Sequence, residues 1–195
     1  MHVPLVRQHI KQDLLALLLV LAVLLSLLLT PAAVRAQGVE LLTLETNKSE
    51  GTINLDFVAR VTLPKAVEDA LQRGVPVYFV AEAQMFRNRW YWRDERVARV
   101  SRSWRLAYRP LTSDWRVSLG GLSQTYSTMA EALAIVSRSG NWKLVDVAQL
   151  DGEKSFYVEF SYRLDTTQLP GPMQFGLGGQ SDWALGASRT LKVEP

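Results

Sequence analysis

The sequence predicts a mainly β protein, an antiparallel β-sandwich of about eight strands with two short helical insertions. Three observations favour this fold class. Apolar and polar residues alternate through most of the chain after residue 51, which is typical of strands with one buried face. The strand-like segments do not run apolar throughout, as the buried strands of a parallel sheet do. Only two short segments change to the helical period.

Residues 1–36 have the composition of a secretory signal peptide. A mildly basic start precedes the uncharged run Leu14–Leu29, and Pro31 ends any helix there. We expect cleavage before Gln37, which leaves 37–195 as a single exported, periplasmic domain of a Gram-negative envelope. The alternative is an uncleaved inner-membrane anchor, although a helix of the apolar run spans about 24 Å and the hydrocarbon core is about 30 Å thick. In that case the leader is the only membrane contact.

The first predicted strand and helix follow each other directly. Residues 51–63 alternate with period two, and the predicted buried face carries Ile53, Leu55, Phe57, Ala59, Val61 and Leu63. Residues 64–74 then change to helical spacing, with an apolar stripe of Ala66, Val67, Ala70 and Leu71. Pro64 suits a first helical turn and Gly74 a helix end. The stripe is expected to pack on the sheet.

Residues 75–120 predict a three-stranded antiparallel meander. A first turn at Asp94-Glu95 pairs Met85 with Trp104, Ala83 with Leu106 and Ala81 with Tyr108. A second turn over 110–113 pairs Tyr108 with Trp115, Leu106 with Val117 and Trp104 with Leu119. Both turns place the same residues on one core face. The opposite face then carries Trp90 beside Arg99, Gln84 beside Arg105, and Arg109 between Val80 and Asp114.

The C-terminal third begins with a second helix. Thr128 and Glu131 have the spacing of a capping box at its start. Residues 143–150 and 154–165 predict a hairpin that turns at Asp151-Gly152, the strongest turn signal in the chain. A loop over 170–179, in which 173–175 is an optional edge strand, leads to a last strand within 183–193.

The composition excludes several kinds of chemistry. The chain has no cysteine, and its two histidines, His2 and His9, both lie in the leader. The domain therefore lacks the side chains of a Ser-His-Asp triad, a Cys-His pair and a thiolate or imidazole zinc site. Carboxylate catalysis, a Ser-Lys arrangement and hard-cation binding remain open, but no paired motif supports them. We expect a non-enzymatic protein with no cofactor, no metal and no nucleic-acid partner.

The candidate site is a cluster of arginines and tryptophans in the meander. Its members, candidates for binding an anion or a partner, are Arg87, Arg89, Trp90, Trp92, Arg99, Arg102 and Arg105. The predicted register places Arg87 opposite Arg102, with Arg89 on the diagonal, and like charges in such positions destabilise a strand pair. Either the hairpin extends into solvent there, or an anion or an acidic loop separates the charges. The alternative for the whole cluster is a solvated strand face.

Three functions are compatible with these features. The leading hypothesis is an envelope binding or accessory module that contacts a protein or an anionic envelope component through the Arg/Trp-rich hairpin. The second is a small-ligand-binding sandwich, and the third is a carboxylate-based hydrolase. An exposed aromatic patch, an apolar internal pocket, or two converging carboxylates with shifted pKa values would distinguish them. Trp104 is expected to be buried and Trp90 exposed.

Several segments also resemble a known family. The run from Gly74 to Tyr126, then MAEAL, LDTTQLPGPMQF and SDWAL, is similar to the proteobacterial exported proteins of domain of unknown function 4390. The resemblance covers nearly all of 37–195. It implies no established activity. It does imply an accessory role in envelope signalling, with a sensor kinase system as a partner, because members are often encoded beside a nitrogen-regulation type sensor kinase.

Overall fold

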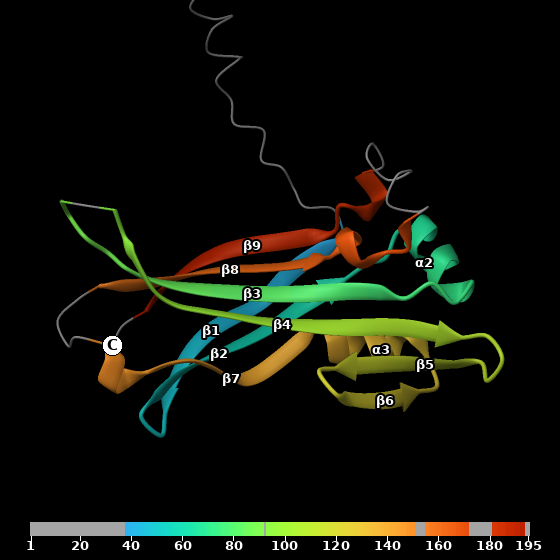
Figure 1. The fold of residues 1–195 in the computed structure, drawn as a ribbon, viewed down its shortest axis with the longest axis horizontal. Coiled ribbons are helices and arrows are strands. Elements are labelled where there is room, and N and C mark those ends of the chain that lie inside the picture. Colours follow the sequence, from blue (N-terminus) through green and yellow to red (C-terminus); the bar gives the residue numbers. More distant parts are fainter. Residues whose placement is uncertain (1–37, 92, 151–154, 172–180, 194–195) are drawn as a thin grey trace, which may run out of the picture. The chain divides into compact units, whose positions relative to one another are not determined.

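The computed structural model describes residues 38–91, 93–150, 155–171 and 181–193, and these form two α-helices, nine strands and three 3-10 helices (Figure 1). The strands are β1 (Val39–Ser49), β2 (Thr52–Val61), β3 (Val77–Arg87), β4 (Glu95–Arg109), β5 (Asp114–Leu119), β6 (Leu122–Tyr126), β7 (Arg138–Asp146), β8 (Phe156–Leu164) and β9 (Gly186–Val193). The helices are α2 (Lys65–Gln72) and α3 (Met129–Val136), with 3-10 helices η1 (Val147–Gln149), η2 (Thr166–Gln168) and η3 (Ser181–Trp183).

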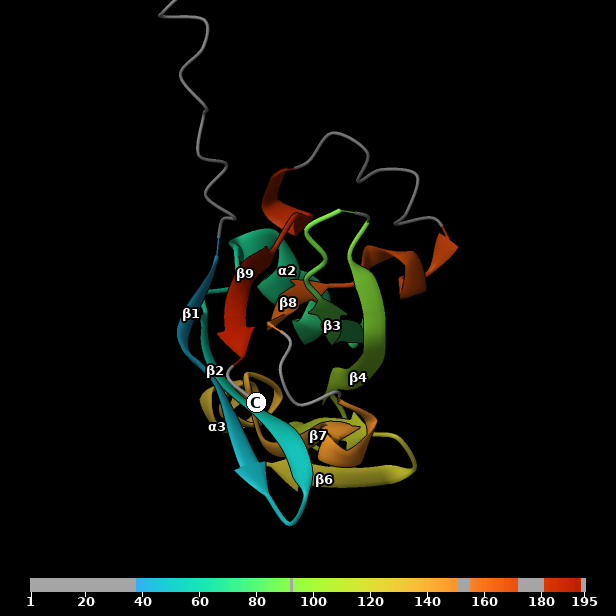
Figure 2. The ribbon, with the colours of Figure 1, turned by 90° about the vertical axis from the view of Figure 1, so that its left-hand side faces the viewer.

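Two antiparallel sheets make up the fold, so the predicted β-sandwich is confirmed. One sheet has the order β1-β2-β7 and the other the order β6-β5-β4-β3-β8-β9. β1 and β2 cross the six-stranded sheet at an angle (Figure 1), and β1 lies next to β9 in both views (Figures 1 and 2). At that edge Arg189 of β9 donates a hydrogen bond from Nη2 to the carbonyl oxygen of Leu41 of β1, at 2.8 Å. This contact joins the two sheets.

The core lies between the sheets, where alternate strand residues point. The inner residues of β3 are at most 1% exposed: Val77, Phe79, Ala81, Ala83 and Met85. Phe57 of β2 packs against Phe160 and Tyr162 of β8, with ring centroids 4.9 and 5.5 Å away. The Tyr162 hydroxyl donates to the carbonyl oxygen of Val136 in α3 at 2.9 Å. Burial raises the pKa of Tyr162, so its hydroxyl remains a donor that ties α3 to the sheet.

Both predicted helices are confirmed, and their ends follow the expected local chemistry. α2 begins after Pro64 and buries Val67, Ala70 and Leu71. Gly74 follows it with a φ of 85°, a conformation that glycine adopts without strain, and its N–H bonds to the carbonyl oxygen of Leu71 at 2.8 Å. The capping box of α3 is present, with the Thr128 hydroxyl accepting from the N–H of Glu131 and the Glu131 carboxylate accepting from the N–H of Thr128.

The predicted register is correct between β4 and β5 but wrong between β3 and β4. The three expected β4–β5 pairs all form, including Trp104 with Leu119. In the β3–β4 pair, however, Trp104 faces Phe79 and Met85 faces Ala98. The turn does not close at Asp94-Glu95, because pairing stops at Arg87 and resumes at Glu95. Over Val77–Met85 the shift is an even number of residues, so these side chains and their β4 partners keep their predicted faces, and alternation alone cannot distinguish the two registers. A bulge between Met85 and Phe86 changes the parity nearer the tip, where Arg96 pairs with Phe86.

Two other expectations about the strands are also corrected. The predicted hairpin of 143–150 with 154–165 is wrong, because β7 pairs with β2 while β8 pairs with β3 and β9. The turn residues Asp151 and Gly152, and the optional strand at 173–175, lie outside the described residues. β1 and β6 were not predicted. β6 is a short edge strand whose first four residues are exposed, so it shows no apolar alternation.

Candidate functional site at the tip of the β3–β4 hairpin

The segment between β3 and β4 presents aromatic side chains to solvent. It follows the last paired residue of β3 and lies at the far end of the hairpin (Figure 1). Trp90 is 93% exposed and Tyr91 is 69% exposed, and their rings meet edge to face with centroids 5.1 Å apart. Trp92 lies outside the described residues. The exposure of Trp90 confirms the prediction made for it, as does the burial of Trp104, which is 2% exposed.

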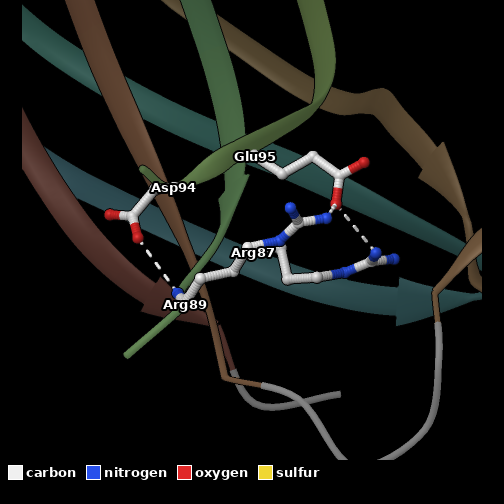
Figure 3. A network of polar contacts seen from close by, with 4 residues as sticks. All are labelled: Arg87, Arg89, Asp94 and Glu95. Atoms are coloured by element: carbon white, nitrogen blue, oxygen red, sulfur yellow. Dashed lines mark hydrogen bonds and ion pairs between the residues drawn. The ribbon is translucent and has the colours of Figure 1, made fainter. Parts of the chain in front are cut away.

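A network of polar contacts holds the base of this segment in place (Figure 3). The carboxylate of Glu95, the first residue of β4, accepts from Nη1 of Arg87 at 3.0 Å and also from Arg89. Asp94 accepts from the backbone N–H of Arg89 at 3.0 Å and from the hydroxyl of Tyr157 in β8 at 2.8 Å. The network therefore connects both strands of the hairpin, the segment between them and the neighbouring strand.

The protonation of two members reflects these contacts. The hydrogen bond from the Arg89 N–H, followed by that from Tyr157, lowers the pKa of Asp94. The hydrogen bond to Asp94 is the main cause that raises the pKa of Tyr157 to about 12. Asp94 is thus an acceptor and Tyr157 a donor at neutral pH. The bond between them persists over the physiological range.

The predicted clash of like charges does not occur. Arg87 faces Glu95 across the strand pair and Arg102 faces Ala81, so the expected opposition of Arg87 and Arg102 is wrong. The side chain of Arg87 is 13% exposed and its guanidinium lies 5.8 Å from the ring centroid of Phe156. Glu95 contacts Arg87 and Arg89 at the tip, whereas Arg102 lies away from them.

The remaining candidate arginines lie elsewhere. Arg99 and Arg105 point to the outer face of the six-stranded sheet, opposite Gln84 and Tyr78, so the expected pairings of Gln84 with Arg105 and of Trp90 with Arg99 are wrong. Arg99 forms an ion pair with Glu82 at 3.1 Å. The six candidates that the structure describes therefore do not form one site.

Arg102 points inward, between the sheets. It donates from Nη1 to the hydroxyl oxygen of Ser139 at 2.5 Å, and its guanidinium lies 5.1 Å from the ring centroid of Trp142. Both partners belong to β7, in the other sheet. Desolvation lowers the pKa of Arg102. No local sequence signal indicates this contact, since it depends on how two distant strands stack.

Arg109 lies beside Asp114 as expected, and its Nε and Nη2 donate to the two carboxylate oxygens of Asp114 at 2.6 and 2.7 Å. The prediction that Val80 is its other neighbour is wrong, because Val80 faces Ser103.

Two glutamates line one hollow on the outer face. Glu82 and Glu159 both line a shallow hollow of about 340 Å³ between β3, β8 and β9. The hydrogen bond from Arg99 lowers the pKa of Glu82, which keeps this group ionised at neutral pH. In the part of the chain that the structure describes, no group of three His, Cys, Asp or Glu residues is arranged to hold a metal ion.

The fold and the hairpin define the class of protein: a two-sheet antiparallel β protein with an exposed aromatic tip. The chain belongs to the family described as a domain of unknown function (DUF4390), whose family model matches residues 36–192. The family membership that the sequence resemblance indicated is therefore confirmed. The chain matches no curated protein and no solved structure. Within the described residues, every helix is too short or too polar to cross a membrane.

Proposed function

We propose that this protein is a non-enzymatic, exported binding module that contacts a protein partner through Trp90 and Tyr91. The observation that supports the proposal is the exposure of these two rings at the end of a hairpin. Large aromatic side chains are costly to leave in water and are enriched among the residues that dominate binding energy. An exposed pair on a supported segment therefore suits a partner's pocket.

The supporting contacts favour binding by this segment. Glu95 holds Arg87 and Arg89, and Asp94 holds Tyr157, so the base of the segment is fixed before any partner arrives. A pre-organised loop loses less conformational freedom on binding and retains more of the contact energy as affinity.

The same contacts favour a protein over an anionic envelope component at the tip. The guanidinium groups of Arg87 and Arg89 already share the carboxylate of Glu95. An added anion would compete with this carboxylate for the same donors. A partner surface with an apolar pocket needs no such exchange. A sensor kinase system, the partner that the family resemblance implies, is the first candidate.

Photocrosslinking in cells tests the contact. The full chain, expressed with its leader in its native host, carries a photoreactive phenylalanine analogue at position 91. We expect one discrete protein adduct, identified by mass spectrometry, and its loss when Trp90→Ala is added. The matched control places the analogue at Leu111, which is fully exposed in the β4–β5 turn. Identical adducts from both positions, or lipid adducts alone at position 91, would contradict the proposal.

Export is tested separately. We expect the protein recovered from the periplasmic fraction to begin at Gln37, as the leader sequence predicts. N-terminal sequencing and intact mass measurement decide the point. A product that keeps Leu14–Leu29 and stays with the inner membrane would instead indicate the anchored alternative.

A further inference from the structure

A cavity opens between the two sheets, away from the hairpin tip. Its volume is about 490 Å³, within the range of pockets that hold small molecules. Apolar lining comes from both sheets and from α3, through Phe57, Trp104, Leu119 and Ile135. Phe57 and Trp104 are almost fully buried, whereas Leu119 is 37% exposed. The cavity thus has buried aromatic walls and a partly exposed aliphatic side chain.

Two guanidinium groups line this cavity, and that of Arg102 lies between the sheets. Arg102 is partly withdrawn from water, and its described contacts are the Ser139 hydroxyl and the Trp142 ring. Neither contact carries a negative charge. Among the ion pairs of the described residues none includes Arg102, in contrast to Arg87, Arg99 and Arg109. A cation that is partly removed from water is costly unless an anion compensates it.

The other charged groups of the cavity do not supply that compensation. Asp56 lines the cavity, but its carboxylate accepts from the N–H of Asn141 at 2.6 Å and from the side chain of Asn47. Arg138, the first residue of β7, adds a second positive charge to the lining. The charged lining side chains therefore number two cations and one carboxylate, and that carboxylate is held by two donors.

We propose that this cavity binds an amphipathic molecule with one anionic headgroup and an unbranched apolar chain. Leu119 and Ile135, the partly exposed apolar lining, would contact the chain over the buried rings of Trp104 and Phe57. Arg102 would donate hydrogen bonds to the headgroup, which is either a carboxylate or a phosphate. The Ser139 contact orients the guanidinium for this role. The site is independent of the hairpin tip, so either proposal can fail while the other holds.

Calorimetric titration of the purified protein tests the site with four ten-carbon probes below their micelle concentrations. They are decanoate, decyl phosphate, decanol and decyltrimethylammonium. We expect both anions to bind at least about 10-fold more tightly than decanol, because a charge-assisted hydrogen bond replaces a neutral one. The cation should bind more weakly than decanol. The relative affinity of the two anions identifies the preferred headgroup. Equal affinity for all four probes would overturn the proposal.

Matched variants locate the binding. Arg102→Gln keeps a donor for Ser139 and removes the charge, so decanoate and decyl phosphate should fall to the affinity of decanol. Arg105→Gln removes the same charge from the outer face of the same strand and should change nothing. Both variants have the same N-terminal segment, so any nonspecific binding of the probes to that segment is the same in the two proteins and does not affect the comparison. Unchanged anion binding in Arg102→Gln, or an equal loss in Arg105→Gln, would refute the site.

A steric variant keeps the test decisive if Arg102→Gln proves unstable. Leu119 is partly exposed and faces Trp104, so Leu119→Trp should place an indole across the cavity at little cost to folding. We expect it to weaken decanoate and decanol alike, by about 10-fold or more. A stable Leu119→Trp protein that binds both probes as before would show that they bind elsewhere.

Discussion

Trp90 and Trp104 lie at opposite extremes of exposure, although only the hairpin turn and part of β4 separate them. Trp104 packs edge to face on Phe57 and Tyr162, with ring centroids 6.1 and 6.4 Å away. Trp90 meets the ring of Tyr91 and is otherwise exposed. The difference follows from position: Trp104 is on the inner face of a paired strand, whereas Trp90 lies beyond the last strand pair. One aromatic residue type is thus buried within β4 and exposed in the segment that precedes it.

The arginines repeat the contrast. Arg87, at the tip, is compensated by a carboxylate of its own hairpin. Arg102, in the interior, contacts a hydroxyl and an aromatic ring from the other sheet. At the tip a carboxylate therefore lies beside the buried arginine and the aromatic rings remain exposed, whereas Arg102 forms no ion pair among the described residues and lies beside apolar surface. The two regions suit different ligands.

The largest expected change in the free energy of unfolding comes from replacing the buried tryptophan. Trp104→Ala should lower the free energy of unfolding by about 3 to 5 kcal/mol, because it removes a fully packed ring and leaves a cavity. Trp90→Ala should change it by less than about 0.5 kcal/mol, as for most exposed substitutions. Urea unfolding of the two variants measures both values. Similar destabilisation by the two would mean that the tip is packed against the protein.

An intermediate effect is expected at the base of the tip. Glu95→Gln removes the carboxylate shared by two arginines, one of them largely buried, and should lower the free energy of unfolding by about 1 to 2 kcal/mol. The value is modest because Glu95 is itself 41% exposed. Glu45→Gln on β1, an exposed position, is the matched control and should be neutral. A neutral Glu95→Gln would remove the basis for a pre-organised tip.

These residues also show which parts of the fold the sequence could predict. Alternation placed Trp104, Met85 and Phe57 on inner faces correctly, because a side chain's face depends only on its own strand. The β4–β5 register followed from a short turn. The β3–β4 register did not, since the connection is longer than two residues and, over Val77–Met85, an even shift leaves the pattern unchanged. The bulge after Met85 has no signal in the alternation.

Contacts between the two sheets could not be predicted from the sequence, for a different reason. Arg102 meets Trp142 only because β4 and β7 stack, and the strong turn signal at Asp151-Gly152 indicated that β7 and β8 pair with each other. Local turn chemistry shows where a chain reverses, but it does not decide which strand lies beside the next. The position of Trp90 at a hairpin end was predictable, whereas the cavity around Arg102 was not.

The smallest effect concerns the hydrogen bond from Tyr157 to Asp94, which joins the tip to β8. Tyr157 has a raised pKa, so this bond stabilises the folded state at pH values below about 10 and is lost as pH rises through about 12. Asp94 has a lowered pKa, so its contribution is present above pH 3.8 and is lost as pH falls through the lowered value.

Ultraviolet titration of the tyrosines, compared with a Tyr157→Phe protein, should assign an ionisation near pH 12 to this residue. In Asp94→Asn the same ionisation should move towards pH 10, because the charged acceptor is gone. A Tyr157 that already ionises near pH 10 in the parent protein would show that the tip is not held to β8. The contrast between a fixed base and an exposed aromatic end would then rest on Glu95 alone.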